Sequence, residues 1–195
     1  MSANVTPEKN EVRISVTDRR RRRSESERAQ AAQAIALHAP AVAALVRARR
    51  VAAYLSMPSE PGTGPLLDWL TELGTEIVVP VSDADRTLDW VAYAPGEVVV
   101  GDLGVPEPTG PRLGESALRA CEVAIIPALA VDHGGNRLGR GAGYYDRALV
   151  DFPGVTCALV YDDELRAELP HEPHDRPVDL VLSPGGLFRP TRGLV

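Results

Sequence analysis

The sequence predicts an α/β fold: a mostly parallel, Rossmann-like sheet with helices on both faces, preceded by an N-terminal helical segment. Short apolar runs rich in Val and Ile alternate with helical patterns from residue 51 onward, whereas the first fifty residues carry helical signals only. With 195 residues, 44% hydrophobic and 25% charged, the chain has the size and composition of one globular domain. We therefore expect a single domain over 1–195, with helices in 1–50, an α/β core in 51–183 and a dispensable tail in 184–195.

The N-terminal segment is predicted to contain helices over 9–23 and from Ser24 to Pro40. Ser24-Glu-Ser-Glu27 has the pattern of a capping box, and an alanine-rich stretch follows it. Pro40 should interrupt this helix, because proline lacks the backbone N–H that a helix interior uses. Helical residues resume over 41–49.

The run Arg19-Arg-Arg-Arg-Arg23 allows two interpretations. It can be a patch that binds nucleic acid or another acidic ligand, or a solvated helix face neutralised by Glu25 and Glu27. The solvated face is favoured, because the net charge of −6 argues against general nucleic-acid binding.

From residue 51 the predicted elements alternate. Strands are predicted at 51–56, 77–81, 88–93, 123–126, 155–161 and 178–182, helices at 64–73, 115–120 and 144–150, and a helical turn near 164–168. Short apolar strands separated by helices are typical of a parallel sheet buried on both faces. The proline-rich segments 95–111 and 170–177 are predicted to be loops.

A glycine-rich segment, Asn136-Arg-Leu-Gly-Arg-Gly-Ala-Gly-Tyr-Tyr-Asp146, is the strongest candidate for a functional site. Glycines at alternate positions let backbone N–H groups approach an anion, and the helix expected after them adds a positive dipole end. The spacing matches neither a P-loop nor the G-x-G-x-x-G dinucleotide fingerprint. The segment should lie at the carboxyl end of strand 123–126, where sheets of this kind bind ligands.

The charged residues of this segment suit a magnesium nucleotide. Arg137 and Arg140 supply forked donors for phosphate oxygens, and Asp146 supplies the hard oxygen that Mg²⁺ prefers. Tyr144 and Tyr145 add flat aromatic surface. A plain turn between strand and helix explains the glycines alone but needs none of these side chains.

Other features exclude several classes of protein. No apolar stretch approaches the roughly 18 residues of a membrane span, and residues 1–10 lack the apolar core of a signal peptide. Cys121 and Cys157 are isolated in apolar surroundings, so we expect buried thiols, no zinc site and a cytoplasmic protein. Metal-ligand spacing is absent among the four histidines, for which solvated roles are favoured.

Residues 127–146 resemble the signature of the 5-formyltetrahydrofolate cyclo-ligases, also called 5,10-methenyltetrahydrofolate synthetases. In that family a proline, an apolar stretch and an aspartate lead into N-R-L-G-R-G-x-G-Y-Y-D. Four further matches span much of the chain: Lys9-x-x-Val-Arg13, Leu55-Ser-Met-Pro-Ser-Glu60 with Thr63, Glu107-Pro108, and His174-Asp-Arg-Pro-Val-Asp179. Pro61 and Gly62 depart from the usual pattern, which leaves the conformation beside Glu60 open.

The resemblance implies an ATP- and Mg²⁺-dependent ligase that converts 5-formyltetrahydrofolate into 5,10-methenyltetrahydrofolate. The family's formyl oxygen is thought to attack the γ-phosphate, and ring closure then releases phosphate. The substrate would be a reduced folate, as the monoglutamate or polyglutamylated. We expect a monomer that binds neither nucleic acid nor membrane. The rival interpretations are a folate- or nucleotide-binding protein without turnover and an RNA-associated protein that uses residues 19–23.

Carried over by position, the resemblance assigns residues to three groups. Nucleotide binding would involve Lys9, Arg13, Arg137, Gly139, Arg140, Gly141, Ala142, Gly143, Tyr144 and Tyr145, with Arg140 and Tyr144 at the reacting centre. The pterin would contact Leu55, Glu60, Trp90 and Tyr144, and Mg²⁺ would be held by Asp146 and Asp175.

Blander alternatives stay open for several of these residues. Lys9 and Arg13 can be a solvated pair one turn apart, and Asp175 can be an ordinary turn residue. Trp90 is more often simply part of a core than a stacking surface. We also expect one of the two tyrosines to be a core residue.

Overall fold

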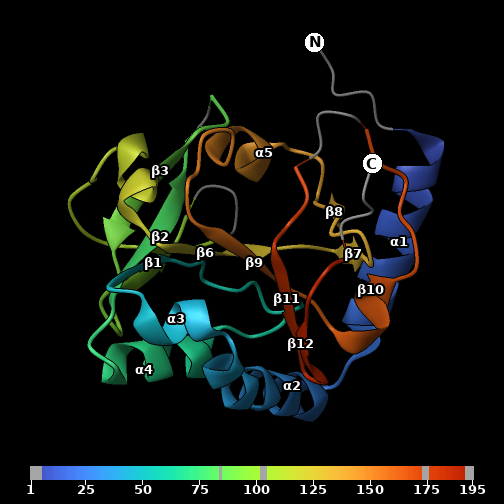
Figure 1. Ribbon diagram of the computed structural model, residues 1–195, viewed down its shortest axis with the longest axis horizontal. Coiled ribbons are helices and arrows are strands. Elements are labelled where there is room, and N and C mark those ends of the chain that lie inside the picture. The colour runs from blue at the N-terminus through green and yellow to red at the C-terminus, as the bar shows by residue number, and fades with distance from the viewer. Residues whose placement is uncertain (1–5, 84, 102–104, 173–175, 192–195) are drawn as a thin grey trace.

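The computed structural model describes residues 6–83, 85–101, 105–172 and 176–191. Its main sheet has seven strands: β1 (Arg50–Ala52), β2 (Glu76–Ser82), β3 (Leu88–Ala92), β6 (Val123–Pro127), β9 (Val155–Leu159), β11 (Leu180–Ser183) and β12 (Gly186–Phe188). Their spatial order is β12-β11-β9-β6-β1-β2-β3 (Figure 1). All neighbours from β11 to β2 are parallel, and only the two edge strands run antiparallel. The predicted mostly parallel α/β fold is confirmed.

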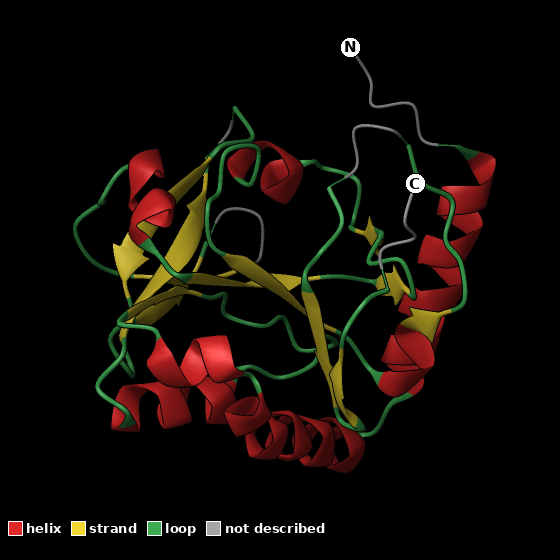
Figure 2. Ribbon diagram, in the orientation of Figure 1, coloured by secondary structure: helices red, strands yellow, loops and turns green. Residues whose placement is uncertain are grey.

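Helices cover both faces of this sheet (Figure 2). They are α1 (Pro7–Arg22), α2 (Glu25–His38), η1 (Ala39–Ala41), α3 (Ala43–Arg47), α4 (Gly64–Glu72), η2 (Glu115–Ala120), α5 (Tyr144–Ala148) and η3 (Asp162–Glu164), where η marks a 3₁₀ helix. Helices α2, α3 and α4 lie together on one face, and α5 lies on the other (Figure 1). α1 lies at one side of the molecule, beside the segments that the figure labels β7 and β10.

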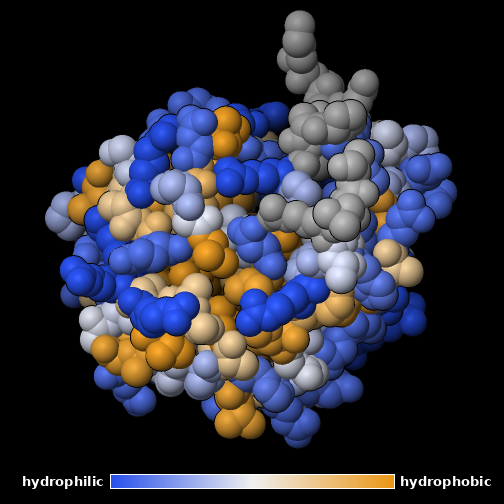
Figure 3. Space-filling view, viewed as in Figure 1, coloured by the Kyte–Doolittle hydropathy of each residue, from blue (hydrophilic) through white to orange (hydrophobic). Residues whose placement is uncertain are grey.

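Two apolar cores follow from the alternation of side chains along the strands. Val123 and Ile125 point into the core beneath α2 and α4, whereas Ala124 and Ile126 point into the opposite core. Because both faces of the sheet are covered, all four of these β6 residues are at most 1% exposed. This is why the strands appear in the sequence as continuous apolar runs. Hydrophilic residues occupy much of the surface in Figure 3, with hydrophobic ones gathered in patches near its centre.

The helix starts follow local chemistry. The Thr6 side chain accepts a hydrogen bond from the Lys9 backbone N–H at 3.4 Å, with Pro7 in the first turn. The predicted capping box at α2 is present, since Ser24 and Glu27 exchange backbone and side-chain bonds. Pro40 lies in η1, which separates α2 from α3, so the predicted interruption is confirmed as well.

The arginine run of α1 is not the solvated face that we expected. Arg20 is 1% exposed and donates from Nε and Nη2 to the two oxygens of Glu164, both at 2.7 Å. Its Nη2 also donates to the Ala128 carbonyl at 2.6 Å. Arg19 and Arg23 pair with Asp163. The neutralising charges thus come from η3, far along the chain, because the α1 face carrying Arg20 packs against that segment.

Two smaller sheets lie outside the predicted elements. Strands β7 (Ala130–Asp132), β8 (Arg137–Leu138) and β10 (Leu165–Arg166) form one, and β4 (Val98–Val100) and β5 (Pro106–Pro108) form the other. The helical turn predicted near 164–168 lies slightly earlier in the chain, as η3, which ends at Glu164. The residues after it form β10, which pairs in parallel with β7. The loop predicted at 95–111 contains the β4–β5 pair.

The segment predicted to be a tail, 184–195, contains a strand that the sequence did not indicate. β12 pairs antiparallel with β11, with Val181 opposite Phe188 and Ser183 opposite Gly186. The tight connection after Ser183 uses Gly186 at a φ of 127°, a conformation that glycine adopts without strain. This strand covers the edge that β11 would otherwise leave open.

The strand order reverses direction at β1. From β1 the chain proceeds to β2 and β3 on one side, and the later strands β6, β9 and β11 build outward on the other. Ligands of open α/β sheets bind outside the carboxyl ends of the strands at such a switch point. The fold therefore directs attention to the carboxyl ends of β1 and β6.

Candidate active site

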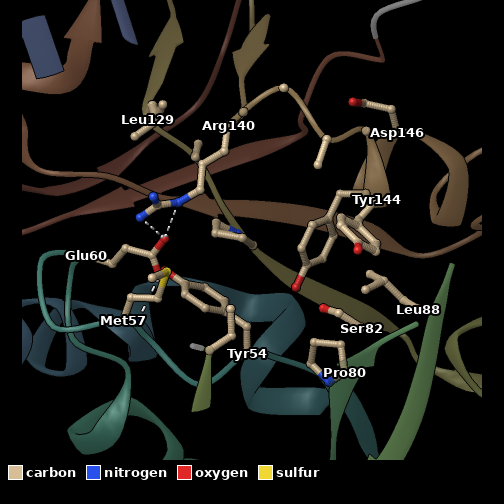
Figure 4. Close-up of a pocket in the computed structure, with 18 of the residues that line it drawn as sticks. Tyr54, Met57, Glu60, Pro80, Ser82, Leu88, Leu129, Arg140, Tyr144 and Asp146 are labelled. Atoms are coloured by element: carbon tan, nitrogen blue, oxygen red, sulfur yellow. Dashed lines mark hydrogen bonds and ion pairs between the residues drawn. The ribbon is translucent and has the colours of Figure 1, made fainter. Parts of the chain in front are cut away.

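A pocket of about 260 Å³ opens at the carboxyl ends of β1, β2 and β6 (Figure 4). The glycine-rich segment forms one wall, and residues that follow β1 form another. The lining consists of Tyr54, Leu55, Met57, Glu60, Pro80, Ser82, Leu88, Val105, Pro106, Pro127, Ala128, Leu129, Arg137, Gly139–Gly143, Tyr144, Tyr145 and Asp146. It combines a mostly apolar floor with a few charged groups, as small-molecule sites do.

A hairpin brings the glycine-rich segment to this position. The segment does not follow β6 directly, because β7 intervenes. β8, which belongs to the segment, pairs antiparallel with β7 and returns the chain. Buried Asp132 stabilises the turn between them, accepting from the Asn136 backbone N–H at 2.8 Å and the Asn136 side chain at 2.9 Å. The first residue of the motif and the aspartate before it thus have structural roles.

Two of the glycines adopt backbone conformations in which any other residue would be strained. Gly141 has a φ of 99° and Gly143 a φ of 74°. A Cβ at Gly143 would lie 2.9 Å from Nη1 of Arg147, and one at Gly141 would meet the guanidinium of Arg13 at 3.5 Å. Arg13 also donates from Nε to the Gly139 carbonyl at 3.0 Å, which attaches α1 to this loop.

The helix after the loop is shorter than predicted. α5 spans Tyr144–Ala148, five residues instead of the expected stretch to 150. A helix this short has a small dipole, so the arginines and the loop N–H groups must provide most of the attraction for an anion.

Arg140 and Glu60 form an ion pair across the pocket (Figure 4). Arg140 donates to Glu60 Oε1 from Nη2 at 3.1 Å and from Nε at 3.3 Å. The Glu60 side chain is 7% exposed and the Arg140 side chain 48% exposed. The carboxylate is thus fixed in the wall, and the guanidinium can turn toward solvent.

The conformation beside Glu60 is held by hydrogen bonds. Glu60 Oε2 accepts from the Met57 backbone N–H at 3.0 Å, and the Tyr161 hydroxyl donates to the Glu60 carbonyl at 3.0 Å. Ser56 and Thr63 exchange backbone-to-side-chain bonds, each at 3.1 Å. Pro61 and Gly62 are accommodated in the turn between them, which answers the question that the sequence left open.

Arg137 and Asp146 form a second ion pair at the rim. The Arg137 side chain is 5% exposed, whereas that of Asp146 is 49% exposed. The pair places a carboxylate at the pocket lining with its outer side open to solvent. Such a carboxylate can bind a hydrated divalent cation.

Three tyrosines contribute hydroxyls around the pocket. Tyr144 donates to the Asp83 carbonyl at 3.3 Å. The buried hydroxyls of Tyr54 and Tyr145 have no hydrogen-bond partner among the described residues. Burial raises the pKa of both phenols, and the negative charge of Glu60 raises each further, so both stay protonated at neutral pH.

Some of the expected residues lie elsewhere. Trp90 is 1% exposed, belongs to the core beside α5 and does not line the pocket. Its environment fits the alternative of a plain core residue. Lys9 is buried near the start of α1, with its Nζ 3.8 Å from Glu172. Asp175 lies outside the described residues.

The structure also adds lining residues that the motifs did not indicate. Tyr54 and Met57 follow β1, Pro80 and Ser82 belong to β2, and Leu129 follows β6. The rule that ligands bind beyond strand carboxyl ends is a signal that could have found them. Val105 and Pro106 come from the proline-rich segment, which nothing in the sequence connects to this pocket.

Within the described ranges, no group of three or more His, Cys, Asp and Glu side chains could hold a metal ion. Mg²⁺ commonly needs only one or two carboxylates, because waters and phosphate oxygens complete its shell. Both cysteines are free and buried, as predicted. None of the helices in the described part of the chain is long and apolar enough to cross a membrane.

Comparisons with known proteins show the family of this chain. The profile of the 5-formyltetrahydrofolate cyclo-ligase family matches residues 5–184. A 5-formyltetrahydrofolate cyclo-ligase of Mycolicibacterium smegmatis is 43% identical over 146 residues, which is 71% of this chain and 75% of the relative. The cyclo-ligase of Escherichia coli K12 is 32% identical over 150 residues, or 74% and 82% of the two chains.

A solved structure gives the same result. The 5,10-methenyltetrahydrofolate synthetase of Aquifex aeolicus superposes with a TM-score of 0.80 at 26% identity, covering 96% of this chain and 95% of that one. The profile match includes the glycine-rich segment and all but the last of the elements described above, since β12 lies beyond residue 184. The chain belongs to the 5-formyltetrahydrofolate cyclo-ligase family.

Proposed function

We propose that this chain converts 5-formyltetrahydrofolate into 5,10-methenyltetrahydrofolate, consuming ATP in the presence of Mg²⁺ and releasing ADP and phosphate. The formyl oxygen attacks the γ-phosphorus, and the neighbouring nitrogen then closes the ring as phosphate leaves. The observation that carries this proposal is the shared pocket. There Arg140, an arginine suited to phosphate, lies within hydrogen-bond distance of Glu60, a buried carboxylate suited to a pterin edge.

Arg140 is the residue that we assign to charge stabilisation. Its guanidinium lies at the pocket surface, half-exposed, and can reach both the wall and the open side. Negative charge spreads over the phosphoryl oxygens as the transfer proceeds, and a positioned guanidinium stabilises that charge. Tyr144 lines the same pocket, where its ring can orient the reacting groups.

The glycine loop and α1 are proposed to hold the phosphates. Gly139, Gly141, Ala142 and Gly143 line the pocket and leave room for close approach of an anion. Arg13 contacts the loop from α1, so it is the helix residue best placed to assist. Lys9 lies one turn away on the same helix and is included by family position alone.

Glu60 is proposed to bind the pterin. A carboxylate accepts two parallel hydrogen bonds, which matches the amino group and ring N–H of a pterin edge. Leu55, on the same pocket wall, supports an apolar contact with the ring. Trp90 is not included, because it lies in the core.

The residues present fit a magnesium ion at the rim. Asp146 supplies one half-exposed carboxylate there, and Asp175 is proposed as the second by family position. When bound, the ion would neutralise phosphate charge and orient the γ-phosphoryl group. The chain itself holds Asp146 beside Arg137, so that the carboxylate can serve the ion while the guanidinium serves the phosphate oxygens.

We further propose that the substrate is a reduced folate with or without a polyglutamate tail, and that the protein acts as a cytoplasmic monomer. Arg140 and Asp146, which line the pocket, are each about half exposed, so the pocket reaches solvent and leaves a tail space to extend. The RNA-associated alternative loses support, because Arg19, Arg20 and Arg23 are engaged by Asp163 and Glu164.

A direct assay tests the proposal. Purified protein is mixed with 5-formyltetrahydrofolate, ATP and Mg²⁺, and the absorbance band of the methenyl product is followed together with ADP release. We expect product only when all three are present, with one ADP formed per turnover. Tight binding of folate and ATP without ADP release would instead identify a binding protein.

A further inference from the structure

The buried hydroxyl of Tyr54 is the feature that neither the family signature nor the proposed reaction explains. Tyr54 follows β1, whose ladder continues through the bond from the Ala53 N–H to the Val78 carbonyl at 2.9 Å. The residue is 4% exposed and lines the pocket. Figure 4 shows its ring extending across the pocket floor toward Glu60.

The hydroxyl has no hydrogen-bond partner among the described residues, although it is fully buried. A buried polar group without a partner lowers stability, and a phenylalanine would fit the same space without that cost. A hydroxyl kept at such a position is explained if a ligand provides the missing partner. The pocket is the space from which a ligand can reach it.

The neighbouring polar groups are already engaged with one another. Glu60 accepts from Met57 and Arg140, and Tyr161 donates to the Glu60 carbonyl. The Tyr54 hydroxyl is thus a donor beside a carboxylate that accepts. Because burial and the charge of Glu60 raise its pKa, the phenol keeps its proton.

The phenol donor of Tyr54 and the carboxylate acceptor of Glu60 together match one edge of a heterocycle. A 2-amino-4-oxo pyrimidine ring presents an amino group, a ring N–H and a carbonyl oxygen in one row. A carboxylate can serve the first two but repels the third, because the carbonyl oxygen is itself an acceptor. A phenol proton next to the carboxylate supplies what the oxygen needs.

We propose that the Tyr54 hydroxyl donates a hydrogen bond to the 4-oxo group of the pterin while Glu60 binds the adjacent N–H groups. Tyr54 is then a specificity-determining residue that distinguishes 4-oxo from 4-amino pteridines. This assignment rests on the proposed function, since it concerns the same pocket and the same substrate. It gives a role to a residue outside the motif.

The experiment combines a residue change with a ligand change. Dissociation constants of 5-formyltetrahydrofolate and of its 4-amino counterpart are measured by calorimetry without ATP, for the unchanged protein and for Tyr54→Phe. We expect the substitution to weaken the 4-oxo ligand about tenfold and the 4-amino ligand hardly at all, because a site that has lost its donor leaves the carbonyl oxygen unpaired. The melting temperature should stay the same or rise.

Tyr93→Phe is the matched control. Tyr93 packs against the same core cluster as Tyr54 but does not line the pocket. Its substitution should leave both dissociation constants unchanged. The KM for ATP should stay within about twofold in both variants, since a hydroxyl that serves the pterin does not touch the phosphates.

The outcomes separate this inference from the proposed function. Failure of the unchanged protein to bind or convert 5-formyltetrahydrofolate refutes the function itself. Normal conversion with an unaltered ratio of the two dissociation constants in Tyr54→Phe refutes the role of Tyr54 alone. A Tyr54→Phe protein that melts at a lower temperature and loses both ligands equally also refutes it, because the hydroxyl would then be structural.

Discussion

Arg140 Nη2 donates to Glu60 Oε1 at 3.1 Å, so the side chain expected to serve phosphate and the side chain expected to serve pterin are partners in the free protein. The sequence separates them by 80 positions. Their contact means that a pterin edge bound to Glu60 competes with Arg140 for the same oxygen. Under the proposed function, release of the guanidinium would make it available to the transferring phosphoryl group.

Replacement of Arg140 by alanine should lower kcat by about 10²- to 10³-fold, because the variant lacks a donor aimed at developing charge. The thermal midpoint should fall only moderately, since the Arg140 side chain is half-exposed and Glu60, although buried, keeps its bond from Met57. Steady-state kinetics and a melting curve measure the two effects. Arg119→Ala removes an exposed pair with Asp151 and serves as the control. Unchanged turnover in Arg140→Ala would remove this residue from the site.

Asp146→Asn should raise the Mg²⁺ concentration needed for half-maximal activity, because a neutral amide binds the ion more weakly than a carboxylate. The substitution also weakens the contact with Arg137, so the KM for ATP is measured separately at saturating Mg²⁺. Asp151→Asn, at an exposed ion pair away from the pocket, is the control. If the metal dependence is the same in Asp146→Asn and in the control, another residue holds the ion.

Arg20→Met should lower the free energy of unfolding by about 3–5 kcal/mol, because it leaves the carboxylate of Glu164 buried and unpaired. The double variant Arg20→Met with Glu164→Leu should recover much of that loss, since no buried charge remains. Arg21→Met disturbs only an exposed pair with Asp18 and should cost under about 1 kcal/mol. Urea unfolding measures all three. Equal effects of Arg20→Met and Arg21→Met would contradict the buried arrangement.

The two thiols should be unreactive in the folded protein. Burial raises the pKa of Cys121 to about 11 and that of Cys157 to about 12, and only the thiolate is nucleophilic. Iodoacetamide at pH 8 should therefore label neither cysteine until urea is added, as mass spectrometry can record. Rapid labelling of either residue in the native state would show that it is accessible.

The same shifts predict a loss of stability at alkaline pH. The unfolded thiols ionise near their ordinary value of 9.0, while the folded thiols stay protonated up to about 11 for Cys121. The native state therefore binds these protons more tightly. The resulting contribution to the free energy of unfolding is complete below pH 9 and is lost as the pH rises toward 11. Urea unfolding at several pH values measures this slope. In a Cys121→Ala variant the slope should be smaller.

The sequence allowed the central strands and the glycine segment to be predicted because their signals are local. β6 and β9 are continuous apolar runs, and the capping box of α2 lies within four residues. Elements defined by pairing were missed or misassigned. β10 and β12 span two and three residues, and each exists because a neighbouring strand offers a free edge.

The site shows the same limit. The motif residues of the glycine loop, together with Leu55 and Glu60, do line one pocket. Arg20 could not be placed from the sequence, because its partner Glu164 lies 144 positions away and a run of arginines is usually solvated. Tyr54 carries no sequence signal of its own, since a tyrosine after a strand is commonly a core residue.

The burial of Arg20 means that α1 is needed for a stable fold. α1 is anchored in the protein interior by a charge, so a shortened chain that starts at Ser24 would bury an uncompensated carboxylate and lose its attachment to the glycine loop. Affinity tags are best added before Thr6, where α1 starts. The N-terminal helix α1 therefore holds the glycine-rich segment in position, through the contacts of Arg13 and Arg20.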